Sequence, residues 1–71
     1  MNKLNPNVGD QVIAHDTFNI INQCVGTVHA IRKTFPTKKD FENNTNQQTV
    51  YVCEFDRGTF ILNRNQIEEI L

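Results

Sequence analysis

The sequence predicts an all-β domain, a small five-stranded barrel with a one-turn helix before its last strand. The strongest evidence is Gln48–Leu62, where nearly every residue on either side of Asp56-Arg57-Gly58 is β-branched or aromatic. Such residues suit a pleated, half-buried surface better than a helix. Gly58 can supply the positive φ of a short hairpin, and Asp56 can accept hydrogen bonds from the turn backbone. A hairpin is therefore the centre of the predicted fold.

The length of 71 residues allows one domain and is too short for two. We expect residues 1–7 to be a flexible lead, because Asn5-Pro6 favours a turn and nothing before it is periodic. Residues 8–71 then form a single small β-barrel domain. A chain of this length buries only about 60% of its unfolded surface. Its core is therefore thin, which argues against a deep catalytic cleft.

Five short apolar segments supply the predicted strands. Gly26 lies inside the second of them and suggests a bulge or a sharp bend, which helps a short strand curve into a barrel. A single helical turn is expected at Asn63–Gln66. The last segment is interpreted as a strand, since a helix that short would be marginal. The predicted strands are Gln11–His15, Cys24–Arg32, Thr49–Phe55, Thr59–Asn63 and Ile67–Leu71.

The first wide connection, Asp16–Gln23, carries three large apolar residues, Phe18, Ile20 and Ile21. Two interpretations remain open for them. They can fold inward and fill the small core, or they can form an exposed contact surface.

The second wide connection, Lys33–Gln47, is polar and Asn-rich and is predicted to be a long connection or a mobile hairpin tip. Basic residues flank two aromatic rings there, as in proteins that bind single-stranded nucleic acid. The same residues also suit docking to an acidic protein, or a solvated loop with its rings folded over the barrel end. The residues concerned are Arg32, Lys33, Phe35, Lys38, Lys39 and Phe41.

Charge and hydropathy limit the classes of partner. Seven basic and eight acidic residues give a net charge of −1, which argues against a dedicated nucleic-acid binder. No apolar run approaches the roughly 20 residues that cross a bilayer, and no secretory signal is visible. We therefore expect a cytoplasmic protein without a membrane partner. Cys24 and Cys53 are expected to be buried thiols in a reducing compartment, with a disulfide as the alternative.

Residue spacing gives no support for catalysis or a cofactor. His15, Cys24, His29 and Cys53 are suitable zinc ligands by type, but no closely spaced pair of ligands is present to nucleate a metal site. The three glycines are dispersed, so no phosphate-binding loop is present. We expect a protein that is not an enzyme and has no cofactor and no metal.

Short motifs carry a resemblance to a known superfamily. They are Val8-Gly9-Asp10-x-Val12, Val25-Gly26-x-Val28-x-x-Ile31, Tyr51-x-Cys53-x-Phe55-Asp56-x-Gly58 and Ile67-Glu68. In this order, with the connections described above, they resemble the Src-homology-3-like small barrels over Val8–Leu71. The chain has no Trp and one Tyr, so the likeness does not extend to the signalling domains that bind proline-rich peptides.

The resemblance is closer to accessory barrels, such as the small stromal subunit of photosystem I or the variable chain of ferredoxin-thioredoxin reductase, and it implies docking to a larger protein. The Asn-rich composition favours a bacterial or phage source. We therefore predict a non-catalytic protein-interaction module, and the alternative is a nucleic-acid-binding accessory protein. Expected protein contacts are Phe18, Ile20, Ile21, Phe35, Lys38, Lys39 and Phe41; the nucleic-acid alternative uses Arg32, Lys33, Lys38, Lys39 and Arg57.

Overall fold

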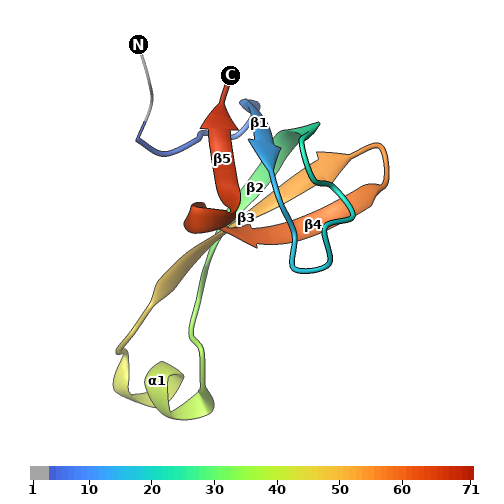
Figure 1. Cartoon of the computed structure of the whole chain (residues 1–71). Helices are drawn as coiled ribbons and strands as arrows, with labels where there is room; N and C mark the ends of the chain where they lie inside the picture. Colours follow the sequence, from blue (N-terminus) through green and yellow to red (C-terminus); the bar gives the residue numbers. More distant parts are fainter. Residues whose placement is uncertain (1–3) are drawn as a thin grey trace.

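The computed structural model describes residues 4–71. Five antiparallel strands form one sheet in the order β4-β3-β2-β1-β5 (Figure 1). The all-β prediction is confirmed, as is the single helical turn before the last strand. The elements are β1 (Gln11–Ala14), β2 (Cys24–Thr34), α1 (Lys38–Asn43), β3 (Gln48–Phe55), β4 (Gly58–Asn63), the 3-10 turn η1 (Arg64–Gln66) and β5 (Ile67–Ile70).

The sheet is open rather than closed into a hydrogen-bonded ring. Within residues 4–71, β4 pairs only with β3, and β5 pairs only with β1. Both strands are therefore edges of the sheet. The η1 turn connects them directly in sequence and brings the chain from one edge to the other.

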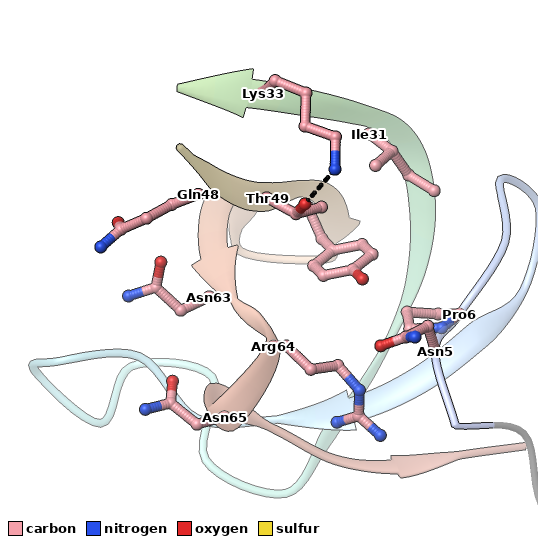
Figure 2. A pocket seen from close by; sticks show the side chains of 10 residues that line it. Asn5, Pro6, Ile31, Lys33, Gln48, Thr49, Asn63, Arg64 and Asn65 are labelled. Carbon is pink, nitrogen blue, oxygen red and sulfur yellow. Dashed lines mark hydrogen bonds between the residues drawn. The ribbon is translucent and has the colours of Figure 1, made fainter. Parts of the chain in front are cut away.

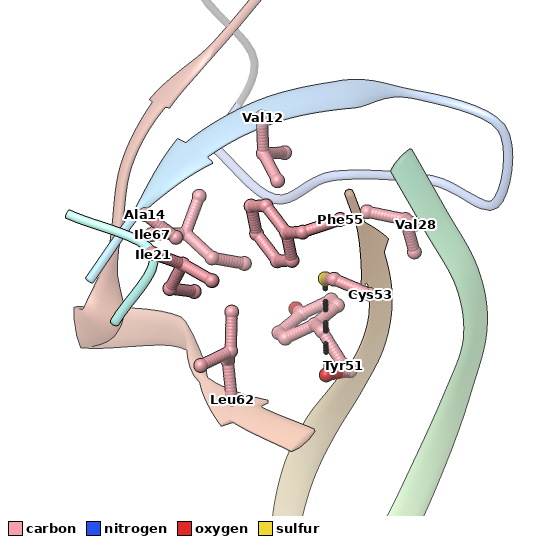
Figure 3. Packing of buried hydrophobic residues seen from close by; sticks show 9 residues of the cluster. All are labelled: Val12, Ala14, Ile21, Val28, Tyr51, Cys53, Phe55, Leu62 and Ile67. Carbon is pink, nitrogen blue, oxygen red and sulfur yellow. Dashed lines mark hydrogen bonds between the residues drawn. The ribbon is translucent and has the colours of Figure 1, made fainter. Parts of the chain in front are cut away.

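The strands form because their inward-facing residues share one apolar cluster (Figure 3). In β3 the alternation is regular: Tyr51, Cys53 and Phe55 are buried, while their neighbours Val52 and Glu54 are more exposed. This period of two is the pattern of a strand with one buried face. The buried apolar residues are Val12, Ala14, Ile21, Val28, Tyr51, Cys53, Phe55, Leu62 and Ile67.

The turn between β3 and β4 confirms the predicted hairpin. Phe55 pairs with Gly58, so only Asp56 and Arg57 lie between the strands. Gly58 has a φ of +130°, which side chains other than hydrogen rarely allow. Glycine at this position therefore permits the short connection.

Gly26 has a different role from the predicted bulge. The register shift of β2 against β3 falls between Val28 and Ala30, so the extra residue is His29. At Gly26, a Cβ atom would overlap the ring of Phe55. Glycine is needed at this position because the aromatic ring lies directly against the β2 backbone.

The second connection is shorter than predicted and contains a helix. β2 continues to Thr34 and β3 begins at Gln48, so the two strands project as an arm with α1 at its tip (Figure 1). Thr37 caps α1 by accepting a hydrogen bond from the Asp40 amide at 3.1 Å. Asn44 ends the helix in the left-handed conformation, with φ of 54°. The helix buries no residue, so local hydrogen bonds hold it.

The predicted flexible lead lies partly outside the described residues, since the structure begins at Leu4. Residues 4–7 make specific contacts. Pro6 is buried, and the Leu4 carbonyl accepts a hydrogen bond from Arg64 Nε at 2.8 Å. The Asn7 amide donates to Asp10 Oδ2 at 2.8 Å. Residues 4–7 therefore lie against the folded domain, and Leu4 contacts the η1 turn through Arg64.

Candidate functional site

A buried carboxylate shapes the first loop, residues 15–23. Asp16 is only 6% exposed, and it accepts hydrogen bonds from the Phe18 amide at 3.1 Å and the Ile21 amide at 3.0 Å. Burial alone would raise the pKa of the Asp16 carboxyl, but hydrogen bonds from the amides of Ile21 and Phe18 outweigh it and lower the pKa below its ordinary value. The loop is therefore fixed by an ionised carboxylate.

This anchoring divides the three apolar residues of the first loop. Ile21 is fully buried and belongs to the core. Its predicted place among the protein contacts is therefore wrong. Phe18 is 81% exposed and Ile20 is 44% exposed. The inward interpretation is therefore correct for Ile21, whereas Phe18 and Ile20 are exposed and their role as a contact surface stays a prediction.

Phe18 and Ile20 line a hollow of about 410 Å³ between the first loop and β4, which we call the loop hollow. The facing wall includes Phe60 and Ile61, and Ile61 is 68% exposed. The exposed apolar side chains of the loop and of the edge strand therefore gather at one place.

A second hollow, of about 490 Å³, lies at the tip of the β2–β3 arm, and we call it the tip hollow. Phe35 and Phe41 meet there edge to face, with ring centroids 5.5 Å apart and ring planes at 83°. Phe35 is half-buried, whereas Phe41 is 68% exposed. Lys33 and Lys38 line the same hollow, so the structure brings the predicted basic and aromatic residues together.

The remaining predicted cations are not all close to the tip hollow. Arg32 and Lys39 are exposed on β2 and α1 respectively. Arg57 lies in the turn between β3 and β4, at the other end of β3 from α1 (Figure 1). Eight strand residues separate these ends, a distance of about 25 Å. Arg57 therefore cannot share one short binding site with Lys38 and Lys39.

A third concavity, of about 770 Å³, adjoins both hollows, and we call it the central groove (Figure 2). Lys33 lines both the central groove and the tip hollow, and Asn63 lines both the central groove and the loop hollow. The central groove therefore shares one lining residue with each of the two hollows. The central groove is lined by Asn5, Pro6, Ile31, Lys33, Gln48, Thr49, Tyr51, Asn63, Arg64 and Asn65.

Two cations in the central groove are held by hydrogen bonds. Lys33 Nζ donates to Thr49 Oγ1 at 2.6 Å. Arg64 Nε donates to the Leu4 carbonyl at 2.8 Å, and its Nη1 donates to the Ile67 carbonyl at 2.9 Å. An ammonium has three donors and a guanidinium five, so each cation keeps donors for another molecule.

The candidate metal ligands and nucleophiles lie apart. Among residues 4–71, no three His, Cys, Asp or Glu side chains converge as a metal site would require. His15 lies 3.8 Å from Glu68, and His29 lies 3.7 Å from Glu54, each between Nδ1 and a carboxylate oxygen. Cys24 and Cys53 are both free thiols. Burial raises the pKa of the Cys53 thiol to about 11, which disfavours the thiolate that a nucleophile needs.

Sequence reasoning missed most of the central groove, because its lining residues come from four separate segments. It also missed the role of Asp16, although an Asp in a loop can accept a hydrogen bond from the backbone amide two residues later, as in an Asx turn. The sequence does contain a signal for the start of α1, because Thr37 and Asp40 have the spacing of an N-cap residue and its partner three residues later.

The geometry defines a small all-β protein with one hollow at each of its two wide connections and a groove that adjoins both. The chain matches no protein-family model, no curated protein and no solved structure. The helices formed by residues 4–71 are too short and too polar for any of them to cross a bilayer.

Proposed function

We propose that this chain is a non-catalytic protein-interaction module that docks to a larger protein through its two wide connections. The observation that carries the proposal is that Phe18, Ile20 and Phe41 are exposed and line two hollows, each of which shares a lining residue with the central groove. Exposed large apolar side chains that gather at one place mark interaction sites more often than scattered ones do.

The composition of this surface supports protein docking. Apolar anchors lie at its two ends, and the central groove between them is lined largely by amide, hydroxyl and basic side chains. Protein interfaces commonly combine a few buried aromatic anchors with a polar rim. Phe18 and Phe41 would be the anchors, and Lys38 and Lys39 would belong to the rim.

We infer that the fold is a Src-homology-3-like barrel whose two edges do not pair. Support comes from the strand order, the long first and second connections, the tight third turn and the η1 turn before β5. In this arrangement β4 and β5 face each other across the core without a shared ladder. The fold alone does not select a function.

The alternative is binding of single-stranded nucleic acid at the tip hollow. It is favoured by one observation, the presence of Lys33 and Lys38 beside Phe35 and Phe41 in the same hollow. The net charge of −1 and the distant position of Arg57 count against it. Retention of a labelled single-stranded oligonucleotide at low salt tests it, and absence of retention removes this alternative.

The docking proposal is tested with Phe18→Ala and Phe41→Ala. A matched control is Val25→Ala, because Val25 is also an exposed apolar residue (49%) but borders Phe55, Asp56 and Arg57 instead. We expect all three variants to keep the wild-type melting temperature. Capture of a specific partner from the native host should be lost in the two Phe variants and retained in Val25→Ala.

Two outcomes would contradict docking through these connections. One is unfolding of both Phe variants, which would make the rings part of the core. The other is equal partner capture by all three variants.

A further inference from the structure

The central groove and the tip hollow are basic although the whole chain is slightly acidic. Lys33, Lys38 and Arg64 line them, and no carboxylate of residues 4–71 lines either concavity. Four of the eight acidic residues lie elsewhere: Glu54 and Asp56 lie at the far end of the β3–β4 hairpin, and β5 carries Glu68 and Glu69. The central groove and the tip hollow therefore have lining cations without a lining carboxylate.

Two acidic residues of α1 are the nearest exceptions. Glu42 is exposed on the helix, outside the lining of the tip hollow. The carboxylate of Asp40 is occupied within the tip, where it accepts hydrogen bonds from Thr37 Oγ1 at 2.9 Å, Thr45 Oγ1 at 3.1 Å and Asn46 Nδ2 at 2.9 Å. These hydrogen bonds hold the Asp40 carboxylate within the tip, and neither Asp40 nor Glu42 lines the tip hollow or the central groove.

The central groove also supplies hydrogen-bonding side chains for the main chain of a bound segment. Lys33 and Arg64 stand on opposite walls, with Thr49 between them (Figure 2). Carboxamides of Gln48, Asn63 and Asn65 line the groove as well. An extended segment of about eight residues spans about 26 Å, which fits within the 36 Å longest dimension of the molecule.

We propose that the central groove binds an extended acidic segment of the partner protein, with its carboxylates at Lys33 and Arg64. This inference rests on the proposed docking function and names the chemistry of the partner. Charge complementarity selects an anion. A peptide is favoured over a nucleic acid, because carboxamides can pair with both the amides and the carbonyls of a peptide main chain. In addition, the only aromatic side chain in the groove, Tyr51, is 4% exposed and leaves little ring face for base stacking.

The probe is a fluorescein-labelled peptide, Glu-Ala-Glu-Phe-Glu-Ala-Glu-Ala, titrated with the full chain and followed by fluorescence anisotropy. A peptide with Gln in place of each Glu, and an oligothymidylate of matched charge, are titrated in parallel. We expect a dissociation constant on the order of 100 μM for the acidic peptide, since exposed charge pairs contribute little each. Binding should weaken as salt rises, and the Gln peptide should not bind.

The decisive variants are Lys33→Glu and Arg57→Glu, which change the net charge equally. Lys33 and Arg57 are both exposed, but only Lys33 lines the groove, so both variants should fold. We expect Lys33→Glu to weaken binding at least about fivefold and Arg57→Glu less than about twofold. In an NMR titration, the amides of Lys33, Thr49 and Asn65 should shift, while those around Arg57 should not.

Equal losses in the two variants would overturn the proposal, because binding would then follow net charge alone. Tighter binding of the oligothymidylate than of the peptide, lost in Lys33→Glu, would overturn it in favour of nucleic acid. Binding of neither probe would also overturn it. The docking function would still be judged separately, by partner capture in Phe18→Ala and Phe41→Ala.

Discussion

At the scale of single residues, Cys53 shows how burial decides chemistry. Its side chain is fully buried among Val12, Val28 and Leu62, and its Sγ lies 3.8 Å from the Tyr51 carbonyl oxygen as a weak donor (Figure 3). Removing the thiol from water penalises its charged form, which raises the pKa to about 11. The second cysteine, Cys24, is only half-buried at the start of β2.

We predict that Cys53 reacts slowly with a thiol reagent in the folded protein. At about pH 8 only about one thousandth of a thiol with this pKa is ionised, and the side chain is also inaccessible. The measurement compares Cys24→Ser, which retains only Cys53, with Cys53→Ala, which retains only Cys24. Cys24 should react faster in the folded state, and the two should react equally in urea. Equal rates in the folded state would show that Cys53 is accessible.

Gly26 is a second residue whose identity follows from one contact. Any Cβ at this position overlaps the Phe55 ring, and Phe55 itself packs edge to face on Phe60, with centroids 5.8 Å apart. Any side chain at this position would require the Phe55 ring to move within the core. Glycine is therefore favoured here for a steric reason, whereas at Gly58 it is favoured by the positive φ.

We predict that Gly26→Ala lowers the free energy of unfolding by about 1–3 kcal/mol. Thr27→Ala, at the exposed neighbouring position, should cost less than about 1 kcal/mol. Urea denaturation of both variants measures the difference. Combining Gly26→Ala with Phe55→Leu should recover part of the loss, and additive losses would contradict the steric account.

At the scale of elements, α1 shows how a helix of six residues can be held without burial. Asp40 makes most of the hydrogen bonds that hold it. Its carboxylate accepts hydrogen bonds from the side chains of Thr37, Thr45 and Asn46, and its backbone carbonyl accepts one from the Thr45 amide at 2.9 Å. The hydrogen bonds from Asn46 and Thr37 hold the pKa of Asp40 below its ordinary value.

This arrangement makes the tip sensitive to acid. Because the pKa of Asp40 is lowered in the folded protein, its contribution is present above the ordinary pKa and lost as pH falls through the folded value. We predict that NMR signals of Thr45 and Asn46 shift toward disordered values between about pH 6 and about pH 2. Asp40→Asn should reproduce this change at neutral pH, whereas Glu42→Gln should not. An unchanged tip in Asp40→Asn would show that the carboxylate is dispensable.

The first loop combines a core residue with exposed ones, so truncation to alanine should cost much stability at the buried position and little at an exposed one. Ile21→Ala should lower the free energy of unfolding by about 2–5 kcal/mol, because it empties a fully buried site. Phe18→Ala should change it by less than about 0.5 kcal/mol, since that ring is 81% exposed. Thermal denaturation measures both. A large loss in Phe18→Ala would place this ring in the core and remove it from the docking surface.

At the scale of the whole molecule, the sheet order predicts a gradient of stability. β2 and β3 form the longest ladder and lie inside the sheet, whereas β4 and β5 are edges. We predict the slowest amide hydrogen exchange in the centre of β2 and β3, slower than in β4 and β5, and the fastest exchange in α1, which buries nothing. Exchange in α1 as slow as in β3 would mean that the tip is packed in a way that this structure does not have.

Much of the fold could be predicted from the sequence because its signals are local. The β-branched and aromatic composition of Gln48–Leu62 placed β3, β4 and their turn to within one residue. The same reasoning placed β1, β5 and the η1 turn closely. It misjudged Lys33–Gln47, because the pairing that extends β2 to Thr34 depends on partners in β3 some fifteen residues away.

The candidate site was predicted in part, and the limit has a physical cause. The sequence left open whether Phe18 and Phe41 fold inward or lie at the surface, and the structure exposes both. The inward position of Ile21 depends on the Asp16 carboxylate that fixes the loop, and on space left in a core built by other strands. Periodicity carries no information about such space.

The sequence by itself determined the all-β class, the central hairpin with Gly58 at its turn, and the balance of charge near zero, since each depends on neighbouring residues or on composition. Only the tertiary structure decided that Gly26 lies beneath Phe55 and that Lys33 and Arg64 face one groove. These are contacts between segments far apart in the chain, and their distances are set by how strands pair and pack rather than by local preference.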